Sequence, residues 1–379
     1  MILTQCAVCA TELGLSLGKK CGRCSTRYCG PECQKQHWEQ GGHDQLCKKI
    51  KKAGGAEQYN ANKKYTEAVA DAAEACTDDT KGQTCYICTQ ALHWKTKEGL
   101  VRGCSCRGTA GFAHVSCLAE QAKLLCDEAE ENNLDMGSRW ERWYLCSLCE
   151  QDYHGVVSCA LGWACWKTYV ARPEADMARI NAMTQLGNGL QDATNYEDAF
   201  SVREAALFML RRLGASENLI LGAQSNLANS CKKLGQVEQA LSLQRYVYFG
   251  DIKLYGEEDE HTISAANNYA SSLNDLQRFE EAKSVLRTTM PVARRVLGES
   301  HELTLKMRRN YAVTFHEDTS ATLDDLREAV TTLEETAPIA RRVLGGSHPL
   351  TEEIDDELRN ARAALAAREG DLCEALEAI

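Results

Sequence analysis

The chain has 379 residues, with 43 lysines and arginines against 54 aspartates and glutamates, and a net charge of −11 at pH 7. This acidic balance argues against nucleic acid as a partner, and the 44% of hydrophobic residues excludes general disorder. The most apolar stretch, residues 156–166, is shorter than the roughly 18 residues that cross a bilayer. Because Cys6 also lies too early for a signal peptide, we expect a soluble intracellular protein of the cytoplasm or nucleus, without a membrane span.

Cysteine is distributed very unevenly along the chain. The first 166 residues hold 18 of the 20 cysteines and all six tryptophans, whereas the remainder is rich in leucine, alanine and glutamate. In a reducing compartment, clustered cysteines indicate metal ligands rather than disulfides. Six cysteines have no partner at ligand spacing, and we expect them to be small buried or surface thiols: Cys76, Cys126, Cys159, Cys165, Cys231 and Cys373.

Residues 1–50 contain eight candidate zinc ligands. They stand in the order Cys6-x-x-Cys9, Cys21-x-x-Cys24, Cys29-x-x-x-Cys33 and His43-x-x-x-Cys47. Eight ligands suffice for two closed tetrahedral sites, since a two-residue gap makes a tight turn and a three-residue gap fits one helix face. Structural zinc contributes ~10–16 kcal/mol in finger peptides, so two ions can order a segment with little apolar core.

The run of residues 28–34 and the following His37-Trp38 resemble a MYND finger. MYND fingers are usually protein-binding modules for short proline-containing peptides. The resemblance implies one zinc on Cys6, Cys9, Cys29 and Cys33, and another on Cys21, Cys24, His43 and Cys47. His37 remains a rival for the histidine position, because Gly41 and Gly42 lengthen the gap that precedes His43.

Residues 51–80 are predicted to be a linker with a short helix, and residues 81–155 contain a second set of eight candidate ligands. These are Cys85-x-x-Cys88, Cys104-x-Cys106, His114-x-x-Cys117 and Cys146-x-x-Cys149. The run of residues 104–109, Cys-Ser-Cys-Arg-Gly-Thr, resembles the RING-CH (RING-variant) finger of ubiquitin ligases. A PHD-like finger is the alternative, although its second ligand pair is normally wider. The RING-CH resemblance implies one zinc on Cys85, Cys88, His114 and Cys117, and another on Cys104, Cys106, Cys146 and Cys149.

A RING-type finger acts by positioning a ubiquitin-charged conjugating enzyme. The resemblance places the docking surface on Ile87 and Leu148, which stand between the two cysteines of the first and last ligand pairs. Filling their own small core is the alternative role for both residues. One position departs from the family: Gln121 stands where RING-CH fingers have a tryptophan, four residues after Cys117.

The rest of the chain is predicted to be helical, with a connecting helix in residues 156–179 and repeats in 180–379. Asn226-Leu-Ala228 recurs 42 residues later as Asn268-Tyr-Ala270 and again as Asn310-Tyr-Ala312. Gly214, Gly256, Gly298 and Gly345 recur at intervals of 42, 42 and 47, which indicates a five-residue insertion in the last repeat. These features resemble the tetratricopeptide repeats of kinesin light chain, in about four copies followed by a capping helix.

Stacked repeats of this kind form a solenoid whose concave face binds peptides. We expect this groove to be lined by residues of the first helix of each repeat: Asn226, Asn229, Asn267, Asn268 and Asn310. Hydrogen bonding within the repeat is the alternative role for the asparagines. His261, His301 and His348 occupy equivalent turns of successive repeats and are predicted to be turn residues rather than a metal site.

The fold class is thus two zinc-stabilised fingers followed by an all-α tetratricopeptide-repeat solenoid. The two fingers together are expected to bind about four zinc ions. The favoured function is a RING-CH-type ubiquitin ligase that recruits protein substrates through its repeats and MYND finger. The alternative is a non-catalytic adaptor or scaffold. The sequence shows no phosphate-binding glycine loop and no nucleophile, and it does not decide between these two functions.

Overall fold

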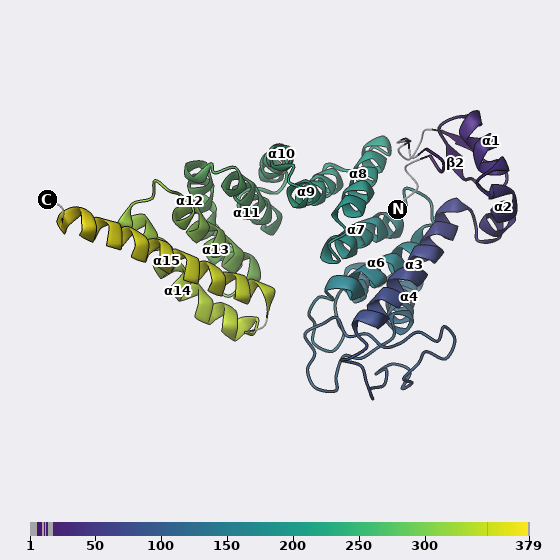
Figure 1. Cartoon of the computed structure of the whole chain (residues 1–379), viewed down its shortest axis with the longest axis horizontal. Helices are drawn as coiled ribbons and strands as arrows, with labels where there is room; N and C mark the ends of the chain where they lie inside the picture. Colours follow the sequence, from purple (N-terminus) through teal and green to yellow (C-terminus); the bar gives the residue numbers. More distant parts are fainter. Residues whose placement is uncertain (1–5, 10, 12, 14–17, 347, 378–379) are drawn as a thin grey trace. The chain divides into compact units, whose positions relative to one another are not determined.

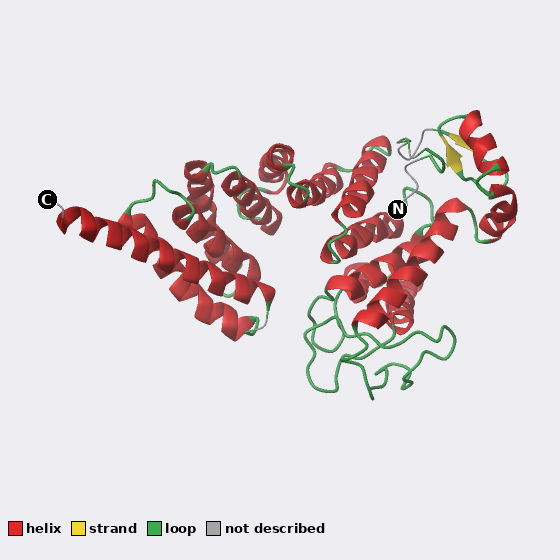
Figure 2. Cartoon of the chain, in the orientation of Figure 1, coloured by secondary structure: helices red, strands yellow, loops and turns green. Residues whose placement is uncertain are grey.

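The computed structural model describes residues 6–9, 11, 13, 18–346 and 348–377, and it divides the chain into two compact units. The first unit is Met1–Ser216 and the second is Glu217–Ile379. Figure 2 shows that helices dominate both units, while the second finger consists largely of loops. None of the described helices is long and apolar enough to cross a membrane.

The first unit begins with the small MYND-like segment (Figure 1). Its hairpin pairs β1 (Lys19–Lys20) with β2 (Arg27–Tyr28) in antiparallel register, so that Lys19 lies opposite Tyr28. Two helices follow, α1 (Pro31–Glu39) and α2 (His43–Lys52). Pro31 stands at the first position of α1, where its missing N–H costs no hydrogen bond.

The segment between the fingers differs from the predicted linker. It forms α3 (Ala56–Ala75), a helix of 20 residues. One face of α3 is buried and packs on α6 (Gly155–Tyr169), which lies about 100 residues further along the chain. The buried face is formed by Ala56, Ala61, Tyr65, Val69 and Ala72. The apolar spacing is sparse in sequence, so only the partner helix reveals that this segment is structural.

Four helices and a 3₁₀ turn complete the first unit. They are α4 (Val115–Asn132), α5 (Met136–Trp140), η1 (Glu141–Trp143), α7 (Met177–Asp192) and α8 (Tyr196–Arg212). Helix α6 is predominantly apolar and is largely buried among α3, α4 and α7. Glycine allows α6 and α7 to approach closely, because a Cβ at Gly189 would stand 2.5 Å from the Ser158 carbonyl oxygen.

The second unit is built from paired helices. The pairs are α9 (Glu217–Lys233) with α10 (Val237–Tyr255), α11 (Glu260–Asp275) with α12 (Phe279–Val296), and α13 (Glu302–His316) with α14 (Leu323–Val343). A single long helix, α15 (Pro349–Glu377), packs on α13 and α14. Alanines of neighbouring helices meet in the core, including Ala270, Ala282 and Ala312.

The repeat signals have clear structural roles. Gly256, Gly298 and Gly345 end their helices with positive φ angles of 87°, 95° and 93°. His301 caps α13, where its ring accepts a hydrogen bond from the Leu303 N–H, and His348 accepts one from Leu350 in the equivalent turn. The turn between α13 and α14 covers residues 317–322 and is longer than its counterparts, which accounts for part of the insertion.

Candidate metal centres and docking surface

The structure brings the 16 candidate ligands together in four groups of four. Within each group the ligand atoms all lie within 4.8 Å of one another. The groups are Cys6, Cys9, Cys29 and Cys33; Cys21, Cys24, His43 and Cys47; Cys85, Cys88, His114 and Cys117; and Cys104, Cys106, Cys146 and Cys149. Each finger thus contains two interleaved groups, as the resemblances imply.

The spacing of the ligand atoms matches tetrahedral zinc. Zn–S bonds of ~2.3 Å at tetrahedral angles place two sulfurs about 3.8 Å apart. The Sγ atoms of Cys9, Cys29 and Cys33 lie 3.4–3.7 Å apart, those of Cys21 and Cys47 lie 3.9 Å apart, and those of Cys106 and Cys146 lie 3.8 Å apart. A disulfide would require about 2.05 Å. The four groups therefore fit four zinc ions.

His43 rather than His37 joins the second group of the MYND-like finger. Its ring is fully buried, and Nε2 lies 3.4 Å from the Sγ of Cys24. The ring of His37 packs 4.8 Å from that of His43, and its Nδ1 forms a 3.0 Å hydrogen bond with the hydroxyl of Tyr28. His37 therefore supports the ligand ring and is itself engaged elsewhere.

His114 is oriented by its own hydrogen bond. Its Nδ1 faces sulfurs of the group, at 3.4 Å from Cys88 and 3.7 Å from Cys117. The opposite nitrogen, Nε2, lies 3.4 Å from the Ala91 carbonyl oxygen. A histidine that donates its second N–H to a carbonyl presents a fixed neutral tautomer to the metal.

Three cysteine pairs share one local backbone structure. The residue after the second cysteine donates its N–H to the carbonyl of the first cysteine. That residue has a positive φ angle in each pair: 63° for Ser25, 63° for Thr89 and 54° for Glu150. In the second finger the turn also aims N–H groups at sulfur, since Ile87 donates to the Sγ of Cys85 and Leu148 to that of Cys146. Donors of this kind stabilise thiolates.

The thiol pKa values diverge within the groups. The hydrogen bond with Cys104 lowers the pKa of Cys146 to about 4, while the same contact raises the pKa of Cys104 well above its usual range. In the first group, the Thr11 hydroxyl lowers the pKa of Cys9 to about 6, whereas Cys29 raises that of Cys33 to about 12. Neighbouring thiols therefore oppose one another's ionisation, and a bound divalent cation would supply the positive charge that favours their thiolate forms.

Gly111 is a structural residue of the second finger that the ligand spacing did not reveal. A Cβ at this position would stand 2.5 Å from the Cβ of Cys106 and 3.3 Å from the Sγ of Cys104. Its φ angle is also positive, at 85°. Glycine is therefore required beside this zinc group, although no sequence pattern linked it to the ligands.

The two predicted docking residues are exposed. Ile87 retains 38% of its accessible surface and Leu148 retains 51%, so neither fills a core. The hydroxyl of Tyr86 lies 3.1 Å from the hydroxyl of Ser147, which joins the two loops directly beside these residues. Trp143, three residues before Cys146, is fully buried against Tyr169 and contributes nothing to this surface.

The expected asparagine groove requires a correction at two positions. Asn310 and Asn267 are only 6% and 7% exposed, and the Asn310 amide donates to the Asn267 side-chain oxygen at 2.8 Å. These two side chains therefore stabilise the stack of repeats. Asn226, Asn229 and Asn268 remain partly exposed, although Asn229 accepts a hydrogen bond from Gln244.

Three protein families match parts of this chain. Residues 6–47 match the MYND finger, residues 85–149 match the RING-variant domain and residues 261–322 match the tetratricopeptide repeat. These matches confirm the three resemblances, and the four ligand groups fit the zinc sites of both fingers. No curated protein matches the chain. The combination of fingers and repeats makes this a zinc-binding protein of the protein-interaction type.

Several solved structures are similar to parts of the chain. One is BtubC (BKLC) from P. vanneervenii, which is 14% identical in sequence and has a TM-score of 0.39. The match covers 70% of this chain and 91% of that chain. Another is a putative kinesin light chain of Podosopora anserina with nearly identical TPR-like repeats, which is 17% identical in sequence and has a TM-score of 0.40. The match covers 61% of this chain and 98% of that chain. The apo form of RapI has 12% identity, coverage of 66% and 85%, and a TM-score of 0.41.

Proposed function

We propose that this chain is a RING-variant ubiquitin ligase that recruits protein substrates through its repeats and its MYND finger. The supporting observation is the exposed pair Ile87 and Leu148, displayed by two zinc loops that the Tyr86–Ser147 contact joins. Exposed apolar side chains on a rigid scaffold suit the docking of another protein. The docked partner would be a ubiquitin-conjugating enzyme.

The proposed catalysis works by positioning. A conjugating enzyme carries ubiquitin as a thioester, and the attacking amine belongs to a lysine of the substrate. Holding both partners on one chain raises their effective concentration and brings the amine near the thioester carbon. Bound zinc would supply only the fixed geometry of the two loops, and no side chain of the ligase has to react.

Each segment of the chain has its own proposed role. In our proposal, residues 1–50 and 180–379 bind protein partners, and residues 81–155 bind the conjugating enzyme. Helix α3 and residues 156–179 hold the second finger, since α6 packs both on α3 and on α4, which belongs to that finger. Because sixteen cysteine and histidine ligands must remain reduced and unprotonated to bind zinc, the reducing cytoplasm or nucleus is the proposed compartment.

A non-catalytic adaptor is the second candidate function, and Gln121 favours it. This residue lies on α4, four residues after Cys117, where RING-CH fingers have a tryptophan. A polar, partly exposed side chain at that position weakens an apolar docking surface. In this case the finger would act as a rigid zinc fold between two protein-binding modules.

The deciding experiment is ubiquitin discharge from a panel of charged conjugating enzymes. The wild type is compared with Ile87→Ala, Leu148→Ala and Cys104→Ser, and Leu134→Ala serves as the matched control because it is an exposed leucine outside both zinc loops. The ligase predicts discharge by the wild type and the control, and its loss in the other three variants. A folded, zinc-loaded wild type that discharges no member of the panel would establish the adaptor instead.

A further inference from the structure

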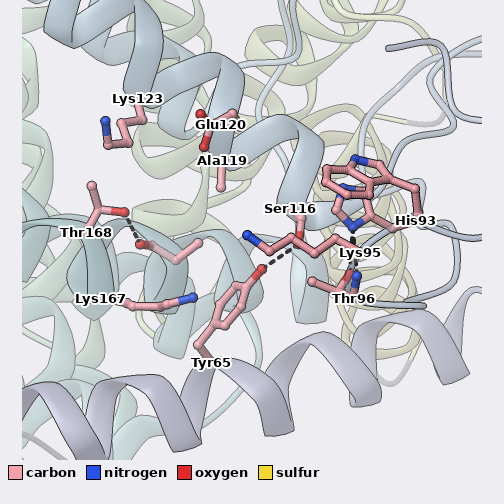
Figure 3. A pocket seen from close by; sticks show the side chains of 12 residues that line it. Tyr65, His93, Lys95, Thr96, Ser116, Ala119, Glu120, Lys123, Lys167 and Thr168 are labelled. Carbon is pink, nitrogen blue, oxygen red and sulfur yellow. Dashed lines mark hydrogen bonds between the residues drawn. The ribbon is translucent and has the colours of Figure 1, made fainter. Parts of the chain in front are cut away.

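A cavity of about 500 Å³ lies beside the second finger, within the first unit (Figure 3). Its walls come from four segments: Tyr65 of α3, the loop of residues 93–96, the face of α4 that contains Ser116 and Lys123, and Lys167 of α6. No zinc ligand lines it, and neither does Ile87 or Leu148. The cavity is therefore separate from the metal centres and from the docking loops.

Positive charge dominates the wall of this cavity. Lys95, Lys123 and Lys167 line it, against one carboxylate, that of the exposed Glu120. Lys123 is paired with Asp127. Over the described part of the chain, neither Lys95 nor Lys167 has a carboxylate within ion-pair distance. In Figure 3 the side chains of Lys95 and Lys167 both extend into the cavity.

Lys167 is the most constrained of the three cations. Its ammonium lies 4.0 Å from the centre of the Tyr65 ring, a favourable cation–π arrangement. Burial lowers the pKa of Lys167, the charge of Glu98 partly opposes this shift, and the charge of Lys95 adds to it. A negative group between the two ammonium groups would relieve both the desolvation and the repulsion.

The carboxylate of Glu98, which does not line the cavity, is hydrogen-bonded to Ser116. Both oxygens of Glu98 accept hydrogen bonds from Ser116, from its N–H at 2.7 Å and from its hydroxyl at 2.8 Å. The hydroxyl of Ser116 in turn lies 2.9 Å from that of Tyr65. This network fixes the Tyr65 ring beneath Lys167, and Glu98 acts on Lys167 through its charge without forming an ion pair with it.

The rim of the cavity offers an apolar contact. Trp94 retains 68% of its accessible surface, the highest exposure among the large hydrophobic side chains that the structure describes. Ala119 and Ala164 line the wall with small apolar groups. A large exposed aromatic next to unpaired cations is the combination that anchors a peptide with both an acidic and an apolar side chain.

We propose that this cavity binds an acidic segment of a partner protein, with an anionic side chain between Lys95 and Lys167 and a neighbouring apolar side chain on Trp94. The anion is a carboxylate or a phosphate monoester, since both satisfy the same two ammonium groups. This site would hold a protein partner close to the second finger. It does not depend on ligase activity, because binding alone is its function.

The test uses degenerate peptide libraries on the full-length, zinc-loaded protein. The central residue is fixed as glutamate, phosphoserine, glutamine or leucine, and the flanking positions are random. We expect the glutamate or phosphoserine library to be retained roughly tenfold more than the glutamine library, with apolar residues enriched near the centre. The comparison between the two acidic libraries identifies the source of the anion.

Substitutions of the cavity residues test whether the acidic peptides bind in this cavity. Lys167→Gln and Lys95→Gln should each abolish most of the acidic preference, and Trp94→Ala should abolish the apolar enrichment. Lys95 is exposed, so its replacement tests the cavity without endangering the fold. Lys81→Gln, an exposed lysine outside the cavity, is the matched control and should bind as the wild type does. Equal retention of all libraries, or an acidic preference that survives in both cavity lysine variants, would overturn the proposal.

Discussion

The hydroxyl of Tyr86 lies 3.1 Å from the hydroxyl of Ser147, and these two residues immediately precede Ile87 and Leu148. They belong to two loops that are about 60 residues apart in sequence. Each loop contributes its cysteines to a different ligand group. The contact is therefore a direct link between the two halves of the proposed docking surface. It should set the spacing of the two apolar side chains.

Removal of this link should reduce ubiquitin discharge without unfolding the finger. Tyr86→Phe and Ser147→Ala each delete one hydroxyl and keep the packing, so we expect a loss of about 0.5–1.5 kcal/mol, or roughly two- to tenfold in rate. Because both variants break the same bond, the double variant should be no slower than the slower single variant. Discharge kinetics measure the rates, and additive losses would show that the two hydroxyls act independently.

Zinc content provides the most direct check of the four ligand groups. Elemental analysis should find about four zinc ions per chain, because each group of four ligands forms one closed site. Cys24→Ser and Cys104→Ser lie in different fingers and should each remove about one ion. Cys231→Ser, a buried cysteine outside the groups, should leave the count unchanged. A wild-type value near two would refute one of the fingers.

Chelation of zinc should unfold the zinc fingers and leave the helical repeats largely folded. Trp143 is fully buried three residues before Cys146, so loss of the ion should change tryptophan fluorescence strongly. Helices α7 to α15 contain none of the residues in the four groups. Most of the helical circular dichroism should therefore persist. If both signals disappear together during titration with a chelator, the repeats depend on the fingers for their stability.

Two glycine substitutions should have opposite effects on stability. Gly189→Ala places a methyl group against the backbone of α6, 2.5 Å from the Ser158 oxygen, and should cost about 1–3 kcal/mol. Gly222 lies within α9 with no atom near the position of a Cβ, so Gly222→Ala should stabilise by about 0.5–1 kcal/mol. Calorimetry of both variants measures the shifts. Similar melting temperatures would mean that α6 and α7 can separate at little cost.

The asparagines of the repeats should also divide into two classes. Asn310→Ala leaves the buried oxygen of Asn267 without its donor and should destabilise the protein by about 1–3 kcal/mol. Asn226 stands at the repeat position equivalent to Asn268 and Asn310, but its side chain is partly exposed. Asn226→Ala should therefore change stability by less than about 0.5 kcal/mol. Urea denaturation distinguishes them. Equal losses would assign Asn226 a structural role as well.

The zinc groups, the repeats and the fold class could be predicted from the amino-acid sequence. Ligand spacing is informative because a tetrahedral ion constrains residues that are close in the chain, as the shared turn at Ser25, Thr89 and Glu150 shows. Helix pairs of a repeat are equally local, so their period appears directly in the sequence. The choice of His43 over His37 required the structure, because both lie within reach along the chain.

The burial of side chains that contact distant segments of the chain could be read only from the folded structure. It shows that α3 is a structural helix, since its partner α6 follows about 100 residues later. It buries Asn267 and Asn310, exposes Ile87 and Leu148, and gathers Tyr65, Lys95 and Lys167 around one cavity. The physical reason is that burial depends on which surfaces the fold places opposite a side chain, and no local spacing specifies those surfaces.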